Sequence, residues 1–289
     1  MDRTIWMRVR GLARALGQDP GSGRYTFTDA DIILTLLWAA LHDKPVSWAC
    51  RPESWPVYER RVRRPSPSRM SRRLRTLSVQ VLIQCIQTEL MHASQDTLVM
   101  ALDGKVLRVA LHSRDAFARV GARGMRGYKL HLICDTFGRI RAWRVTPLNC
   151  HEAVIARRII KPMRIEGYLL ADANYDTTYL HDLCARSGGQ LVTPRMKCRI
   201  GKPLDPRRHT PQRERSVLML ELDHTGFGRD LIAKRGVVER VFARLEMNHH
   251  IGQVPAHVRG LFRVRLWMQA IILLDLARSA PTSSQLAAA

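Results

Sequence analysis

The sequence predicts a mixed α/β protein, in which a small all-helical region precedes a larger domain built on a sheet flanked by helices. The chain has 289 residues and 46% of them are hydrophobic, which is enough for a substantial core. Residues 1–95 carry helical patterns and no strand pattern. From residue 98 onward, short apolar runs bounded by turn signals alternate with helical stretches. That alternation is typical of an α/β domain.

The N-terminal region, residues 1–95, is predicted to consist of helices. Asp29 and Asp31 begin a helix that continues through 32–41, and acidic side chains are favourable in a first turn. Ser68 is a good N-cap for a later helix. The apolar stripe expected on that later helix comprises Met70, Leu74, Leu77, Val81 and Cys85.

Arginine is concentrated at residues 51–75, which hold nine Arg against two Glu. Positive charge in the first turns of a helix opposes the helix dipole, whereas a duplex phosphate backbone would reverse that cost. The turn, the capping serine and the arginine-rich helix resemble the second half of a helix-turn-helix. The alternative is a solvated basic face. The residues predicted to contact DNA are Arg69, Arg72, Arg73 and Arg75.

The whole chain is strongly basic, with a formal net charge of +22, which predicts a polyanionic partner. Its six cysteines include no Cys-x-x-Cys pair, which argues against zinc and favours reduced thiols. The start of the chain lacks a signal-peptide pattern. The apolar runs 32–41 and 266–274 are too short to span a bilayer. We therefore expect a cytoplasmic protein with no membrane partner.

The second region, 96–280, contains every predicted strand. Strands are expected at 98–102, 106–111, 129–134, 140–145, 168–171 and 190–193. Two of these alternate around a turn at 135–138 and predict a hairpin. Helices are expected at 152–160, 177–186, 234–248 and 258–278. A basic insertion at about 194–230 includes an irregular stretch at 195–215 and a candidate strand at 216–222, and the tail 281–289 is predicted to be disordered.

Three carboxylates are candidates for metal-dependent chemistry. Asp103 and Asp172 each end an apolar run, and ligands gather at strand ends in α/β folds. Glu239 lies on a late helix, with Arg235 four residues before it to orient it or to bind phosphate. Two Mg²⁺ ions held by carboxylates can drive phosphodiester chemistry. The alternatives are a helix cap at Asp172 and a solvated side chain at Glu239.

Five sequence blocks in one order resemble DDE-type insertion-sequence transposases, whose catalytic domain has a ribonuclease-H-like fold. The blocks are 102–105 (Leu-Asp-Gly-Lys); 127–135; 145–149 with 151–152; 170–176; and 235 with 238–240 and 242. The resemblance covers roughly 98–278, and only weakly the helical region before it. It implies a ribonuclease-H-like catalytic domain at 96–280, and the helical region 1–95 would then serve DNA binding and dimerisation.

The resemblance also implies a site and an activity. Asp103, Asp172 and Glu239 would be the catalytic acids that bind two Mg²⁺ or Mn²⁺ ions, and Arg235 and Lys105 would contact DNA phosphate. The implied partner is double-stranded DNA, both element ends and target, bound by a homodimer assembled on the DNA. The implied location is the bacterial cytoplasm, in association with the nucleoid.

Two positions depart from the family pattern. Many members carry Tyr three residues before the Arg and Lys or Arg about seven after the Glu, where this chain has Ile232 and Glu246. Three readings therefore stay open. The first is an active transposase, the second is a transposase-derived DNA-binding protein that has lost its chemistry, and the third is a ribonuclease-H-fold nuclease that cuts without joining.

Overall fold

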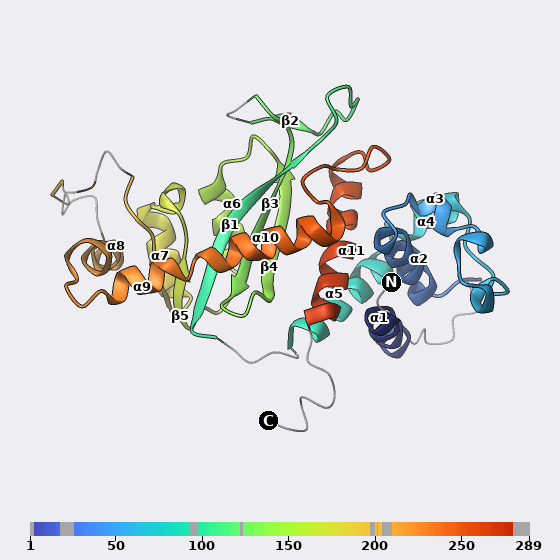
Figure 1. Cartoon of the computed structure of the whole chain (residues 1–289), viewed down its shortest axis with the longest axis horizontal. Coiled ribbons are helices and arrows are strands. Elements are labelled where there is room, and N and C mark those ends of the chain that lie inside the picture. The colour runs from blue at the N-terminus through green and yellow to red at the C-terminus, as the bar shows by residue number, and fades with distance from the viewer. Residues whose placement is uncertain are drawn as a thin grey trace. The chain divides into compact units, whose positions relative to one another are not determined.

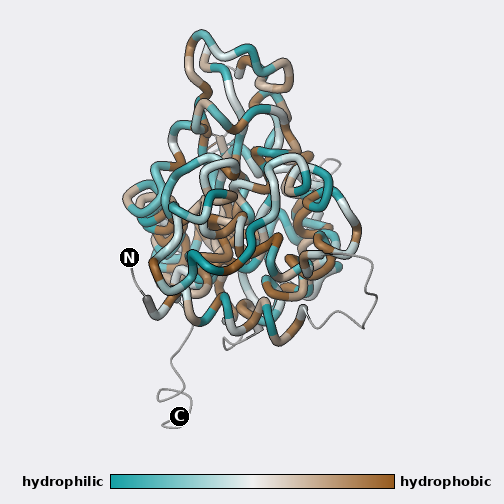
Figure 2. The backbone as a smooth tube through the Cα atoms, turned by 90° about the vertical axis from the view of Figure 1, so that its right-hand side faces the viewer, coloured by the Kyte–Doolittle hydropathy of each residue, from teal (hydrophilic) through white to brown (hydrophobic). Residues whose placement is uncertain are grey.

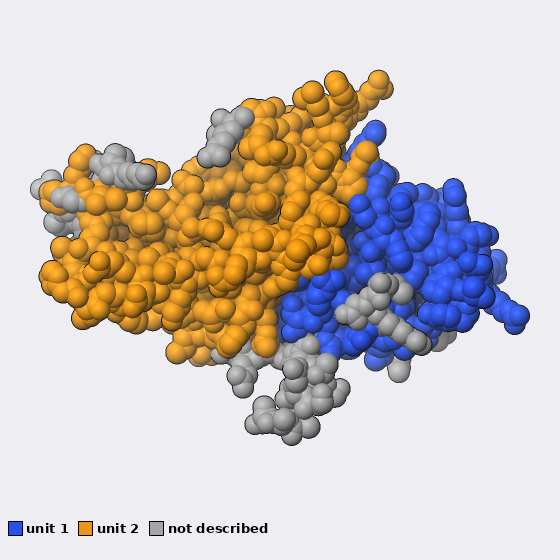
Figure 3. All heavy atoms as spheres, viewed as in Figure 1, with its two compact units in different colours: residues 1–95, 257–289 blue, residues 96–256 orange. Residues whose placement is uncertain are grey.

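The computed structural model describes residues 3–17, 26–92, 97–121, 124–196, 200, 202–203 and 210–279. The chain divides into two compact units, which Figure 3 colours separately. Unit 1 comprises residues 1–95 and 257–289, and unit 2 comprises residues 96–256. The predicted tail, 281–289, and most of 197–209 lie outside the described residues.

Unit 1 is built from helices. They are α1 (Arg3–Leu16), α2 (Asp29–Leu41), α3 (Val46–Ala49), α4 (Pro67–Arg73), α5 (Leu77–His92) and α11 (Leu261–Ser279), with short 3-10 turns η1 (Pro52–Ser54) and η2 (Val57–Glu59). The last helix, α11, packs against α1, α2 and α5. The sequence predicts this helix as part of the second domain, whereas the structure groups it with unit 1.

An aromatic cluster fills part of the core of unit 1. The ring centroid of Trp38 lies 5.0 Å from that of Trp6 and 4.6 Å from that of Trp55. All three side chains are buried. The indole N–H groups of Trp38 and Trp55 donate to the carbonyls of Ser54 and Ala49, at 2.9 and 2.7 Å. The buried polar atoms of these two rings are therefore paired, which removes the penalty for burying them.

The helix predicted from Ser68 is two helices rather than one. The cap of α4 is Ser66, whose hydroxyl accepts from the backbone N–H of Arg69 at 3.3 Å, and α4 ends at Arg73. The turn before α5 resets the helical phase, so the stripe through Met70 and Leu74 does not continue. Leu77 is 79% exposed. The residues that α5 buries are instead Val79, Leu82, Ile83, Ile86 and Leu90.

Unit 2 is organised around a six-stranded mixed sheet (Figure 1). The strands are β1 (Val99–Arg108), β2 (Arg119–Val120), β3 (Arg126–Asp135), β4 (Ile140–Pro147), β5 (Gly167–Leu170) and β6 (Gly189–Val192). Their order is β2-β3-β1-β5-β6, and β4 also pairs with β3. The β1–β3 and β3–β4 pairs are antiparallel, whereas β1–β5 and β5–β6 are parallel.

Helices cover both faces of this sheet. They are α6 (Glu152–Ile160), α7 (Thr178–Arg186), α8 (Pro211–Val217), α9 (Phe227–Ala233) and α10 (Gly236–His249), with a 3-10 turn η3 (Ala173–Tyr175) and a π-helical turn η5 (Leu218–Leu222). Met100 and Leu102 belong to the buried cluster under α6 and α7. Because side chains alternate along a strand, Ala101 and Asp103 face the other side, where α10 packs against β1 and β3.

The predicted fold class is confirmed, as a ribonuclease-H-like mixed sheet flanked by helices and preceded by a helical region. Figure 2 colours the backbone by hydropathy and shows hydrophobic and hydrophilic stretches alternating along the chain. None of the described helices is long and apolar enough to cross a membrane.

Two strand predictions were wrong. The strands expected at 98–102 and 106–111 are the single strand β1, because 103–105 keep regular pairing with β3. Residues 216–222 are helical.

Candidate active site

Asp103 lies in β1, and Asp172 lies two residues past the end of β5, the strand that pairs with β1 in parallel. The parallel register of β1 and β5 pairs Val99 with Tyr168 and Ala101 with Leu170. Continued by two residues, it sets Asp103 opposite Asp172, and adjacent strands are about 4.8 Å apart. The pairing itself ends at Leu170. The edge of β1 that carries Asp103 is therefore open on that side, and this opening makes a mid-strand aspartate accessible.

The two aspartates are held by different local bonds. Asp103 Oδ1 accepts from the backbone N–H of Gly104 at 2.7 Å, and its Oδ2 accepts from Arg235 at 3.2 Å. Asp172 is the N-cap of η3 and accepts from the backbone and the side chain of Asn174, at 2.9 and 3.2 Å. The cap reading of Asp172 is therefore correct. A cap leaves carboxylate lone pairs for another ligand, so the cap is compatible with the prediction that Asp172 binds metal.

Arg235 connects Asp103 to Glu239. One terminal nitrogen of its guanidinium donates to Asp103, and the other donates to Glu239 Oε1 at 2.9 Å. The Glu239 side chain, in the first turns of α10, is 62% exposed. Within the described residues, no three His, Cys, Asp or Glu side chains gather closely enough to hold a metal ion together. The fold thus brings Asp172 close enough for its charge to act on Asp103, and it links Glu239 to Asp103 through the guanidinium of Arg235.

The electrostatics of the aspartate pair favour a cation. Burial raises the pKa of Asp103, and the negative charge of Asp172 raises it further, while the Gly104 N–H and Arg235 lower it. Burial also raises the pKa of Asp172, and the charge of Glu152 adds to that rise. Two partly desolvated carboxylates that disfavour each other's charge gain free energy when a cation binds between them.

Glu152 and Lys129 are site residues that the sequence reading did not select. Lys129 Nζ forms an ion pair with Glu152 Oε1, and both side chains are largely buried. The pair lies beside Gly104, where an added Cβ would stand 2.9 Å from Lys129 Cδ and 3.5 Å from Glu152 Oε1. Glycine next to Asp103 therefore makes room for this pair. The available signal was a glutamate at the first position of α6 within a matching block, which is equally a common helix-start residue.

The remaining predicted phosphate contacts divide between the two units. Lys105 follows Asp103 by two residues in β1, so it shares that face of the sheet. In unit 1, Arg72 and Arg75 are exposed and Arg69 is half-buried. Arg73 is buried, forms an ion pair with Asp29 and donates to the carbonyl of Phe27 at 3.1 Å. We therefore assign Arg73 to the core of unit 1, and the other three arginines stay predicted DNA contacts.

The two departures from the family pattern have defined surroundings. Glu246 lies near the end of α10, and its carboxylate accepts from the backbone N–H of Gly252 at 2.6 Å. It therefore holds the chain that follows α10. Ile232 is half-buried on α9. Neither side chain is suited to bind a phosphate.

The chain is similar to known proteins in sequence and in fold. Residues 94–274 match the family model described as the transposase DDE domain. Comparison with curated proteins finds no match. Among solved structures, the chain is similar to piggyBac transposase in a cryo-EM synaptic complex with hairpin DNA, with a TM-score of 0.51 and 11% sequence identity. That alignment covers 97% of this chain and 73% of the piggyBac chain, and at such low identity it shows a shared fold.

Proposed function

The chain belongs to the transposase DDE domain family, and from this premise we propose that it cuts DNA at the ends of a mobile element and joins the freed ends to target DNA. The observation that supports this proposal is the parallel pairing of Ala101 in β1 with Leu170 in β5, because Asp103 and Asp172 each follow these residues by two positions. The strongly basic chain, at +22, suits a polyanionic substrate.

Transposase DDE domains are in general dependent on divalent metal, and the donor set of this site fits such an ion. Its candidate ligands are carboxylates, and oxygen donors select Mg²⁺ or Mn²⁺ over softer metals. Asp103 and Asp172 would hold two ions, and Glu239 would complete one of them. When bound, such ions activate the attacking oxygen and stabilise the leaving one.

Arg235 is the residue that connects acid placement to DNA binding. A guanidinium has five N–H donors, and the contacts with Asp103 and Glu239 use two of them. The others can donate to the phosphate being cut, with Lys105 nearby on the same face of the sheet. Transfer of Arg235 from Glu239 to that phosphate would release the glutamate toward the aspartate pair. In this scheme DNA binding completes the site.

The chemistry uses one site twice. Water attacks a phosphorus at the element end, a new P–O bond forms, and the 3′-oxygen leaves with a proton. The freed 3′-hydroxyl then loses its proton and attacks a phosphorus of target DNA, so that one phosphodiester bond forms and another breaks. The role of the protein is to orient the phosphates and to balance their charge.

A second candidate function is DNA binding without catalysis. Two observations favour it: the structural use of Glu246, and the exposed Glu239 side chain, which contacts Arg235. Such a protein would bind element ends through unit 1 and leave them intact. A nuclease of the same fold would instead cut them and fail to join them.

Replacing the two aspartates tests the proposal. Duplexes carrying the ends of the DNA element that encodes the chain are incubated with wild type, Asp103→Asn or Asp172→Asn in Mg²⁺. The proposal expects cleavage and joining by wild type, a loss of both of at least about 1,000-fold in the variants, and end binding within about twofold. Wild type that binds ends without cutting supports the second candidate, and cutting without joining supports a nuclease.

A further inference from the structure

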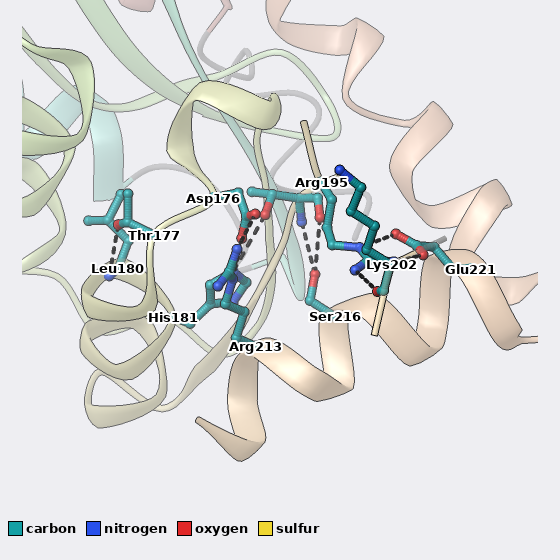
Figure 4. Close-up of polar contacts among 10 residues, drawn as sticks. Asp176, Thr177, Leu180, His181, Arg195, Lys202, Arg213, Ser216 and Glu221 are labelled. Atoms are coloured by element: carbon teal, nitrogen blue, oxygen red, sulfur yellow. Dashed lines mark hydrogen bonds and ion pairs between the residues drawn. The ribbon is translucent and has the colours of Figure 1, made fainter. Parts of the chain in front are cut away.

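A buried polar cluster lies on the far side of the Asp172 turn from β1, at the contact of η3, α7 and α8 (Figure 4). Arg213 of α8 donates through Nε to Asp176 Oδ1 at 2.8 Å and through Nη2 to Asp176 Oδ2 at 2.6 Å. His181 Nε2 lies 3.3 Å from the same Oδ1. The side chains of Asp176, Arg213 and His181 are 3%, 5% and 0% exposed. This is a bidentate ion pair withdrawn from water.

The helix that supplies Arg213 is itself fastened to the sheet. Ser216 Oγ accepts from the backbone N–H of Thr193 at 3.1 Å and lies 3.3 Å from its carbonyl oxygen. The side-chain amide of Gln190, in β6, donates to the carbonyl of Gln212 at 2.8 Å. These bonds join α8 to β6 and to the residue that follows it. Arg213 therefore projects from a fixed support rather than from a mobile loop.

Asp176 is rigidly connected to Asp172. The turn η3 has Asp172 as its N-cap and Asp176 as its C-cap. Tyr175 N–H donates to the carbonyl of Asp172 at 3.1 Å, and Asp176 N–H donates to that of Ala173 at 3.2 Å. Tyr175 is fully buried. With one closed turn between the two carboxylates, a displacement of Asp176 moves Asp172.

Stability alone explains this arrangement poorly. Burying two charges costs desolvation energy that a well-packed apolar pair of the same size avoids, so a buried ion pair often adds nothing to stability. What a bidentate guanidinium–carboxylate pair does supply is a fixed orientation. Outer bonds of this kind commonly set metal affinity by orienting the ligands.

We propose that Asp176 and Arg213 are positioning residues that hold the Asp172 turn against α8, at the place beside β1 where Asp172 binds divalent metal. This inference rests on the proposed function. It assigns a role to α8, part of the segment that the sequence presented only as a basic insertion. Arg213 is about 40 residues from Asp172 in sequence, so only the fold reveals the link.

The test is Mn²⁺ affinity, measured by titration calorimetry without DNA. The main variant replaces the pair by apolar residues, Asp176→Leu with Arg213→Met, and thermal unfolding verifies its fold. The inference expects Mn²⁺ to bind at least about tenfold more weakly than to wild type, with DNA binding unchanged. The matched control is another ion pair of this segment, Arg195 with Glu221. Its variant, Arg195→Met with Glu221→Leu, should bind Mn²⁺ within about twofold of wild type.

Two further variants make every outcome decisive. Arg213→Lys keeps the charge and loses the bidentate geometry, so it should also weaken Mn²⁺ binding, and it decides the question if the apolar pair does not fold. A folded apolar variant or an Arg213→Lys protein with wild-type Mn²⁺ affinity overturns the inference. Asp172→Asn separates this failure from failure of the proposed function. If Asp172→Asn binds Mn²⁺ as tightly as wild type, Asp172 is not a metal ligand and the proposed metal site is wrong.

Discussion

At the scale of single residues, Arg235 is a cation between two carboxylates. It donates to Asp103 and to Glu239, and its charge lowers the pKa of both Asp103 and Asp172. A guanidinium at this position neutralises part of the carboxylate charge, as a bound divalent ion would. Metal and arginine should therefore compete for the acids, and DNA phosphate should attract the arginine away from them.

This competition predicts opposite effects of one substitution. Arg235→Gln removes the competing charge, so Mn²⁺ should bind about two- to tenfold more tightly in the absence of DNA. The same change removes a phosphate contact, so cleavage should fall by about 100-fold or more. Arg229→Gln, on the exposed surface of α9, is the charge-matched control. Weaker Mn²⁺ binding by Arg235→Gln would contradict the role given to this arginine.

The raised pKa values of Asp103 and Asp172 predict a pH dependence. A carboxyl whose pKa is higher in the folded than in the unfolded chain destabilises the fold once it ionises, so this cost is present at neutral pH and is relieved by acidification. Without metal, the Asp103→Asn, Asp172→Asn double variant should unfold at a higher temperature than wild type at pH 7.5. The difference should shrink toward pH 5. A lower Tm for the variant at pH 7.5, or a gap that widens on acidification, would contradict the pKa directions.

At the scale of elements, α4 separates two kinds of arginine that the sequence presents as one cluster. Arg72 is exposed, whereas Arg73 is buried against Asp29. Arg72→Gln should weaken DNA binding and flatten the plot of log affinity against log salt by about 0.9. Arg73→Gln should leave that slope unchanged and cost about 3–5 kcal/mol in the free energy of unfolding. Equal slopes for wild type and Arg72→Gln would show that Arg72 on α4 does not contact DNA phosphate.

The elements that the sequence predicts well are those in which the hydrophobic pattern and the flanking turn signals indicate the same boundaries. The hairpin of β3 and β4 alternates around a clear turn, and the helix α10 keeps a helical period. The strand β5 is an apolar run bounded by turn signals. The predicted apolar stripe through Leu77 was wrong, because a short turn between α4 and α5 shifts the helical phase and contains no Gly or Pro that would indicate it. The strand prediction at 216–222 was wrong, because tertiary hydrogen bonds such as Ser216–Thr193 determine whether a short apolar run becomes a strand or a helix. At the site, Asp172 follows β5 as expected, whereas Asp103 lies inside β1 rather than at the end of the apolar run that singled it out. Both acids stay predicted site residues, and Lys129 and Arg213 are brought near them only by the fold.

At the scale of the whole molecule, unit 2 is continuous in sequence and interrupts unit 1. Unit 1 contains α11 from the far end of the chain, and α11 buries Leu273 at 1% exposure among the N-terminal helices. The family match, 94–274, therefore extends into a helix that completes the other unit. The stability of unit 1 should depend on residues that a sequence comparison assigns to the catalytic domain.

Leu273→Ala tests that dependence. Truncating a fully buried leucine should cost about 2–5 kcal/mol, and the loss should fall on the unfolding transition of unit 1. Tryptophan fluorescence reports mainly that transition, because five of the six tryptophans lie in unit 1 and Trp143 alone lies in unit 2. Met247→Ala, exposed on α10 of unit 2, is the control and should change nothing. An unshifted fluorescence transition in Leu273→Ala would show that α11 does not stabilise the core of unit 1.

The central claim is that Asp103, Asp172 and Glu239 share one divalent metal site. Iron-directed cleavage measures this directly: Fe²⁺ replaces Mg²⁺ on the DNA-bound protein, ascorbate and peroxide generate radicals at the ion, and the broken peptide bonds are mapped by mass spectrometry. The account predicts cuts close to all three acids, at β1, at the turn after β5 and at the start of α10, and their loss in Asp103→Asn. Cuts confined to other segments, or cuts that persist unchanged in that variant, would contradict it.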